Sequence, residues 1–202
     1  MALGYVRPAR DTDVDDIARV QLATWQVAYP RFIPRFAIDA VRLDWLVERW
    51  TEAVTAPPTS RHRVLVAIEQ SGADATSDAD PDPEGDTPPG VEHLVGFAAI
   101  GPADEAAAAP GESALGDDVA AITDLLVEPR WGRRGHGSRL LAATIDHWRD
   151  DGFRQAVAWV FTEDVATTRF LSSAGWEPDG ASRALDIDGV RVPQIRMHVG
   201  FA

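Results

Sequence analysis

A Gly- and Arg-rich loop between an apolar run and an amphipathic helix is the part of this sequence best suited to chemistry. It contains Gly135 and Gly137, which remove side chains where the backbone must turn sharply and expose successive N–H groups. These N–H groups lie at the start of a helix predicted over 134–151, where unpaired donors and the helix dipole favour an anion. Four arginines surround the same point: Arg130, Arg133, Arg134 and Arg139. Because each cation near a helix N-terminus costs about 0.3–1 kcal/mol, a bound phosphate would offset their repulsion, whereas the alternative is a strand-turn-helix with solvated arginines.

The loop does not match two common phosphate-binding motifs. No Gly-Lys-Ser/Thr follows it, so it is not a P-loop, and it lacks the Gly-x-Gly-x-x-Gly of a Rossmann fold. Instead, Val127-x-Pro129 followed by Arg134-Gly135-His136-Gly137 resembles the acetyl-CoA-binding signature of the GCN5-related N-acetyltransferases, the GNAT superfamily. One departure is Gly132, which stands where the family usually has Gln or Arg. The neighbouring arginines could supply the positive charge.

This resemblance implies acetyl-CoA as the cofactor and CoA as a product. It implies that backbone groups of the strand pair with the pantetheine arm and that the loop amides hold the pyrophosphate. The implied pantetheine residues are Leu125, Leu126 and Val127, and the implied pyrophosphate cradle consists of Arg133, Arg134, Gly135, His136, Gly137 and Ser138.

A second stretch, residues 164–176, resembles the fourth-helix motif of the same family, Asn-x-x-Ala-x-x-x-Tyr-x-x-x-Gly-Phe. Asp164 can serve as the helix N-cap that Asn usually provides, which adds Asp164 to the implied cofactor site. Gly175 fits the end of the helix, and Trp176 replaces the usual Phe. Leu171 departs from the motif, because many members carry a Tyr there that protonates the departing CoA thiolate. That role cannot pass to a leucine.

The composition indicates a single domain without cysteine chemistry. The 202 residues suffice for one domain with a substantial core, which we predict to span 1–202. The absence of cysteine excludes disulfides, Cys-rich metal sites and a Cys acyl-enzyme, so acetyl transfer would be direct, and no metal site is predicted. No signal peptide precedes Asp11, and no apolar run approaches the ~18–20 residues of a membrane span. We therefore expect a cytoplasmic protein that does not bind membranes.

Negative charge is concentrated in one part of the chain. Residues 71–120 hold 12 of the 32 acidic residues and no Arg or Lys, so they account for most of the net charge of −13. Within them, the Pro- and Gly-rich stretch 71–90 lacks large apolar residues, and we expect it to be a flexible insertion in a hairpin. The acidic segment could attract a cationic amine or simply be a solvated loop. No broad basic face is evident, so nucleic acid is not an expected partner.

The predicted elements follow the order strand, two helices, three strands, helix, strand, helix and two strands. The strands are expected at 5–7, 61–69, 93–101, 119–128, 153–161, 184–187 and 192–199, and the helices over about 12–28, 37–54, 134–151 and 164–174. This order is similar to the complete GNAT fold, an α/β protein with a mixed, mostly antiparallel seven-stranded sheet and about four helices. Trp45 and Trp50 are expected on the core-facing side of the second helix.

The strand before the loop offers no base at the positions that the resemblance implies. Family members often place a Glu or His base there, on the face that carries the Val127 side chain. Two-residue alternation puts Ala121, Thr123 and Leu125 on that face, and none can act as a base. Asp124 falls on the opposite face of a regular strand, so we expect a structural role for it.

Three other residues are candidates for catalysis. Tyr29 follows the first helix, where relatives often line the acceptor site, and it could be an acid, an aromatic wall or a packing residue. Glu163, at the end of the fifth strand, is either near the reaction centre or a surface cap. Ser172 could protonate a thiolate in place of the missing Tyr, or lie on the helix surface. Three tryptophans either wall the acceptor site or belong to the core: Trp25, Trp45 and Trp50.

Together these features predict an acetyl-CoA-dependent N-acetyltransferase that moves an acetyl group directly to a primary amine of a small-molecule acceptor. One alternative is acetylation of protein N-termini or lysines, which would need an open groove. The other is a non-catalytic acyl-CoA-binding sensor, favoured by Leu171 and by the empty base positions. Dimers are common among relatives, so a homodimer and a monomer both stay open.

Overall fold

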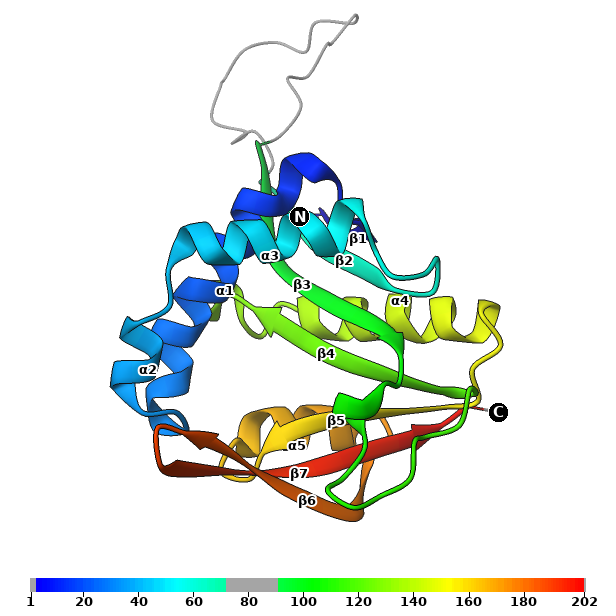
Figure 1. Ribbon diagram of the computed structural model, residues 1–202. Coiled ribbons are helices and arrows are strands. Elements are labelled where there is room, and N and C mark those ends of the chain that lie inside the picture. The colour runs from blue at the N-terminus through cyan, green and yellow to red at the C-terminus, as the bar shows by residue number, and fades with distance from the viewer. Residues whose placement is uncertain (1–2, 72–90, 202) are drawn as a thin grey trace, which may run out of the picture.

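The computed structural model describes residues 3–71 and 91–201 (Figure 1). Most of the predicted insertion 71–90 lies outside the described residues. The strands are β1 (Leu3–Pro8), β2 (Arg63–Ser71), β3 (Val91–Pro102), β4 (Val119–Val127), β5 (Gln155–Phe161), β6 (Glu177–Ile187) and β7 (Val190–Gly200). The helices are α1 (Val14–Ala28), α2 (Arg35–Asp39), α3 (Leu43–Thr55), α4 (His136–Asp150) and α5 (Val165–Ser173), and a 3₁₀ turn, η2 (Tyr29–Arg31), follows α1. None of the helices in these two ranges is long and apolar enough to cross a membrane.

The helix predicted over 37–54 is in fact two helices, α2 and α3. Arg42, between them, has an extended backbone (φ −98°, ψ 138°), so α3 begins anew at Leu43. Along α3, Leu46 and Trp50 are buried, whereas Trp45 is 50% exposed. Residues four positions apart share a helix face and adjacent residues do not. The core prediction is therefore confirmed for Trp50 and wrong for Trp45.

The sheet has seven strands in the order β1-β2-β3-β4-β5-β7-β6, which confirms the mixed, mostly antiparallel prediction. β4 and β5 form the parallel pair, because the chain crosses over through α4 between them. Their pairing covers four positions, from Val119 opposite Gln155 to Ile122 opposite Ala158. Both strands continue beyond these residues, so they separate, and Figure 1 shows them diverging.

Helices cover both faces of the sheet. α1 and α3 pack on one face around Ile17, Trp50 and Phe97, and the Trp50 and Phe97 rings meet edge to face with centroids 4.9 Å apart. α4 and α5 pack on the other face, around Leu140 and Leu171. Full burial of a Leu or Phe side chain stabilises by about 1.5–3 kcal/mol, so the two layers hold the diverging strands firmly in place.

A β-bulge interrupts β4 directly after its last residue paired with β5. Asp124 pairs with Ala99 of β3 and Ile122 with Ile100, so Thr123 is an extra residue. As a result, Ile122 and Leu125, three positions apart, pack on the same core cluster as Val127. The predicted two-residue alternation is therefore wrong upstream of the bulge. Ala121, expected on the face of Val127, packs in a separate small cluster with Val119, Val157 and Ala107.

Candidate active site

A cavity of about 440 Å³ lies where β4 and β5 separate. We call it the strand-gap cavity. Residues 122–127 of β4 and 158–161 of β5 line two opposite walls of the cavity. The end of α1 together with η2 lines a third wall, and α5 lines a fourth. Every one of these segments is held by the core, so the cavity is a property of the fold and not of a loose loop.

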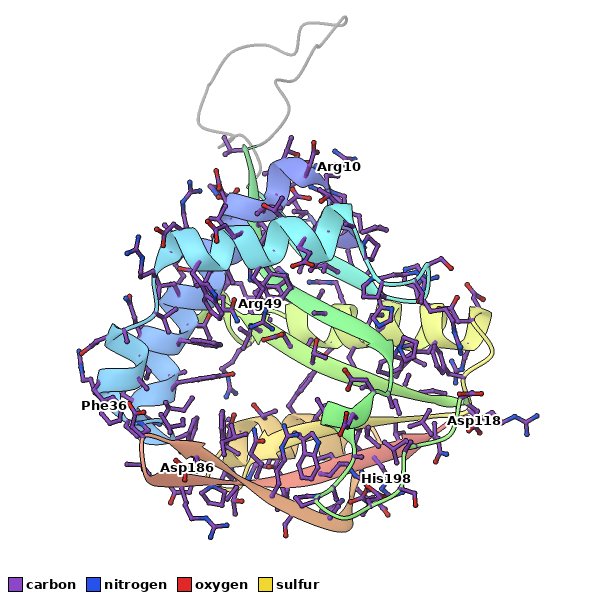
Figure 2. All side chains as sticks on the ribbon, in the orientation of Figure 1. Arg10, Phe36, Arg49, Asp118, Asp186 and His198 are labelled. Atoms are coloured by element: carbon purple, nitrogen blue, oxygen red, sulfur yellow. The ribbon has the colours of Figure 1, made fainter. Side chains whose placement is uncertain are left out.

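Asp124 reaches this cavity from β4, although a structural role was expected for it. Its side chain is 13% exposed, and its carboxylate oxygens lie 3.4 Å from Gln21 Nε2 and 3.5 Å from Arg49 Nη2. Figure 2 shows Arg49 over the sheet, between α3 and β4. Gln21 is itself fixed, because it is fully buried and its Oε1 accepts a hydrogen bond of 2.7 Å from Trp50 Nε1.

Burial sets the acidity of Asp124. Loss of hydration raises the pKa of Asp124 to about 6, and the positive charge of Arg49 opposes the rise. A carboxylate with a pKa just below neutrality is ionised at pH 7 and still basic enough to accept a proton from a reacting group. Among the described residues, Asp124 is therefore the cavity side chain best suited to act as a general base. The sequence signal was an acid within an otherwise apolar strand.

Tyr29 lines the same cavity, as expected for a candidate beside the acceptor site. Its ring stacks on Trp25 with centroids 5.8 Å apart and meets Phe161 edge to face at 5.5 Å. Burial, together with the negative charges of Asp124 and Asp164, raises the pKa of Tyr29 well above its usual value. The hydroxyl therefore stays protonated at neutral pH, and although the raised pKa makes it a weaker acid than an ordinary tyrosine, it can donate a hydrogen bond to a developing negative charge.

The other two catalytic candidates lie away from the cavity. Ser172 is exposed on the outer surface of α5, because its neighbour Leu171 is the residue that turns inward, where it is 1% exposed and lines the cavity. Glu163 is exposed in the turn between β5 and α5. The structure does not bring either side chain to the strand-gap cavity.

A second cavity of about 500 Å³ lies on the Gly- and Arg-rich loop. We call it the loop cavity. Gly135, the N-cap residue directly before α4, has φ 82°, in the left-handed region, and a Cβ added at Gly137 would lie 3.4 Å from the Phe170 ring. Arg133 also has positive φ, 64°, which is strained for a residue with a side chain. Gly135 thus occupies a backbone conformation that favours glycine, whereas a Cβ at Gly137 would make an ordinary van der Waals contact with Phe170.

The two cavities meet along the edge of β4. Leu125, Val127, Ala166 and Thr167 line both of them. The predicted cofactor residues that line one cavity or both are Leu125, Leu126, Val127, Arg133, Gly135, His136, Gly137, Ser138 and Asp164. The structure therefore brings residues from the strand, the loop and α5 to two adjacent cavities with a shared wall.

Arg134 is the exception among the predicted cofactor residues. Its guanidinium lies 4.8 Å from the centroid of the Trp131 ring and 3.5 Å from the carboxylate of Glu69, and its side chain does not line either cavity. Arg130 likewise has an acidic partner, with its Nε 2.6 Å from Glu128 Oε1. The repulsion among the loop arginines is thus partly offset by the protein's own acids, which the sequence did not indicate.

Asp164 caps α5, as predicted. Its Oδ1 accepts a hydrogen bond of 3.0 Å from the backbone N–H of Thr167, and its Oδ2 accepts one of 2.6 Å from the Thr167 hydroxyl. Both carboxylate oxygens are therefore occupied, although Asp164 lines the strand-gap cavity. In the described parts of the chain, no group of three His, Cys, Asp or Glu side chains is placed to hold a metal ion.

The three tryptophans have separate positions. Trp50 is in the core between α3 and the sheet, and Trp45 is on the outer surface of α3. Trp25 stacks on Tyr29 and so supports the wall of the strand-gap cavity without lining it.

Comparison with known proteins is consistent with this geometry. The model of the acetyltransferase (GNAT) family matches residues 45–176. A search of curated protein sequences found no match.

Solved structures share the fold at low sequence identity. The PaiA N-acetyltransferase of Thermoplasma acidophilum, in complex with coenzyme A, has a TM-score of 0.64 at 15% identity, over 98% of this chain and 99% of that one. YncA of Salmonella typhimurium, with its cofactor acetyl-CoA, gives 0.62 at 20% identity over 98% and 93%. The ribosomal-protein-alanine N-acetyltransferase of Brucella melitensis gives 0.63 at 17% identity over 97% and 99%. These likenesses extend along almost the whole chain and concern the fold.

Proposed function

Because the chain belongs to the acetyltransferase (GNAT) family, we propose that it is an N-acetyltransferase that moves an acetyl group from acetyl-CoA directly to a primary amine. The observation that carries the proposal is the meeting of the loop cavity and the strand-gap cavity along Leu125 and Val127. One cavity suits a phosphate-bearing cofactor and the other holds a base. Their junction is where the two substrates would react.

The loop residues fit the pyrophosphate of the cofactor. Positive φ at Arg133 and Gly135 turns successive backbone N–H groups toward one side, and the N-terminus of α4 adds its dipole. The edge of β4 from Leu125 to Val127 would hold the pantetheine arm. When bound there, acetyl-CoA supplies the thioester carbonyl carbon that the amine attacks.

We assign the proton transfers to Asp124 and Tyr29. Asp124 accepts the proton that the amine loses as the C–N bond forms, and Tyr29 donates its hydroxyl proton to sulfur as the C–S bond breaks. Proton exchange with solvent then restores both groups. Tyr29 would therefore take the role that Leu171 cannot fill. General acid–base catalysis of this kind contributes roughly 10²–10⁴-fold, and holding the amine beside the thioester contributes further by proximity.

The walls of the strand-gap cavity favour a small acceptor with an apolar body. Tyr29, Phe32 and Phe161 contact one another, with ring centroids 5.5–6.1 Å apart. Among the described residues that line the cavity, the charged side chains are Asp124, Asp164 and Arg31. Asp164 already caps α5, so Asp124 is the carboxylate better placed to pair with an amine, and Arg31 would repel a second cation. A monoamine therefore fits better than a polyamine.

The sensor alternative rests on Leu171. This buried leucine cannot donate a proton, and it stands at the position where many family members have a proton-donating Tyr. If Tyr29 cannot reach the sulfur, the protein would bind acetyl-CoA and turn it over slowly or not at all. Acetylation of a protein N-terminus is the second alternative, and it needs room for a peptide beyond the aromatic wall.

Calorimetric titration followed by an amine panel separates these functions. Acetyl-CoA is titrated first, and then phenethylamine, spermidine or a peptide with a free N-terminus is added while CoA thiol release is measured. Binding followed by release with phenethylamine supports the proposal. Release with spermidine or the peptide alone would overturn the acceptor assignment, binding without release would favour the sensor, and no binding would overturn the cofactor assignment.

A further inference from the structure

A buried carboxylate that the proposed reaction does not use lies beneath the loop cavity. Glu69 of β2 has a side chain that is 6% exposed. Its Oε1 lies 3.5 Å from Arg134 Nη1 and its Oε2 lies 3.1 Å from His136 Nε2. An ionised carboxylate is costly to bury without such partners. The burial of Glu69 between Arg134 and His136 therefore suggests that it has a specific role.

His136 connects Glu69 to a second arginine. The imidazole is 1% exposed, and burial lowers the pKa of His136, so the ring is neutral at pH 7 and carries one proton. Arg139 Nη1 lies 3.4 Å from His136 Nδ1, and because Arg can only donate, Nδ1 is the acceptor. The single proton is therefore on Nε2, which lies 3.1 Å from Glu69 Oε2 without the alignment of a hydrogen bond.

These contacts close into a ring. Arg139 Nη1 also donates a hydrogen bond of 3.3 Å to the backbone carbonyl of Arg134, and the side chain of Arg134 returns to Glu69. The ring thus joins β2 to both ends of the segment 134–139. That segment includes Gly135 and Gly137 and begins α4, so its shape decides where the loop N–H groups point.

β1 closes the ring from the other side through Gly4. A Cβ built at Gly4 would lie 2.8 Å from Arg139 Nη1 and 3.3 Å from Glu69 Oε2. Gly4 therefore leaves the space that the Arg139 guanidinium and the Glu69 carboxylate occupy. Three separate elements, β1, β2 and α4, contribute to this one polar cluster.

We propose that Glu69 is a positioning residue that sets the affinity for acetyl-CoA, by holding residues 134–139 in their anion-binding conformation. The inference rests on the proposed cofactor site. Two effects of neutralising Glu69 on CoA affinity have opposite directions. Removal of a negative charge near the pyrophosphate would by itself tighten CoA binding, whereas loss of the contacts that hold residues 134–139 should weaken it.

The test is the Kd for CoA of wild type and Glu69→Gln, measured by calorimetry. We expect the Kd to rise about tenfold, equivalent to about 1.4 kcal/mol, while kcat at saturating acetyl-CoA is unchanged and KM for acetyl-CoA rises in proportion. The matched control is Glu92→Gln, an exposed acid on the neighbouring strand that accepts a hydrogen bond from Tyr5, for which the Kd should not change. An unchanged or lower Kd for Glu69→Gln, or a fall in kcat without a rise in KM, would overturn the inference.

Gly4→Ala is the second variant, because it alters no charge. The added methyl group displaces the Arg139 guanidinium, so we again expect weaker CoA binding with kcat preserved. If Glu69→Gln does not fold, Gly4→Ala serves as the test instead, and an unchanged Kd of Gly4→Ala for CoA would overturn the inference. Failure of wild type itself to bind CoA would instead overturn the proposed function, which keeps the two failures distinguishable.

Discussion

Replacing Asp124 by Asn tests the assignment of the general base. With a pKa of about 6, Asp124 is about nine-tenths ionised at pH 7 and about one-tenth ionised at pH 5. The rate constant kcat for wild type should therefore fall about tenfold for each pH unit below 6. In Asp124→Asn we expect kcat at pH 7 to fall roughly 10²–10⁴-fold and the inflection near pH 6 to disappear.

Stability provides an internal control for this variant. The folded protein holds the Asp124 proton more tightly than the unfolded chain does, since the pKa rises from the ordinary 3.8 to about 6. The free energy of unfolding therefore decreases as the pH rises from about 4 to about 6, because the folded protein must release the Asp124 proton. The total decrease is at most about 3 kcal/mol and is complete by pH 7. Asp124→Asn removes that cost, so its Tm at pH 7 should equal or exceed that of wild type.

The assay is a pH series of CoA release from pH 5 to 9 with phenethylamine as the acceptor. Asp146→Asn, an exposed acid on α4, is the matched control and should keep both the rate and the inflection. An Asp124→Asn variant that retains wild-type kcat, or still shows the inflection near pH 6, would refute the base assignment.

Three further substitutions test the rest of the site. Tyr29→Phe keeps the aromatic packing and removes the proton donor, so kcat should fall roughly 10–100-fold with the Kd for CoA unchanged; a change in Kd alone would contradict the acid role. Gly135→Asp places a carboxylate among the loop N–H groups at φ 82° and should abolish CoA binding in a calorimetric titration, whereas retained affinity would show that the loop is not the anion site. Arg133→Gly relieves a positive φ of 64° and should stabilise the fold by about 0.5–1 kcal/mol in urea unfolding, and a lower midpoint would mean that the Arg133 side chain contributes more than its strain costs.

The cofactor side of the site could be predicted from the sequence because its signals are local. Gly135 and Gly137 mark a tight turn before a helix, and Asp164 marks a helix start, and each of these features depends on a few adjacent residues. The structure confirms the helix that follows the loop and the cap at Asp164. Glycine spacing and capping chemistry therefore carry much of the positional information about this half of the site.

The catalytic side could not be predicted because it depends on contacts between distant strands. Regular alternation correctly places Asp124 on the face opposite Val127, where it meets Gln21 and Arg49. The separation of β4 from β5 beyond Ile122, which opens the cavity beside Asp124, has no local signal in the sequence. Ser172 follows the position of the missing Tyr by one residue, and this shift along α5 moves its side chain from the cavity to the surface. Glu69 was missed entirely, since it lies on β2, far in sequence from the loop that it contacts.

Direct transfer can be tested by following the acetyl group itself. Acetyl-CoA with a deuterium-labelled acetyl group is incubated with the protein and phenethylamine, and both the amine and the intact protein are analysed by mass spectrometry during turnover. Direct transfer predicts the label on the amine nitrogen, no labelled protein, and CoA formed in equal amount. Labelled protein during turnover, or CoA released with the label in free acetate and none on the amine, would contradict the proposed reaction.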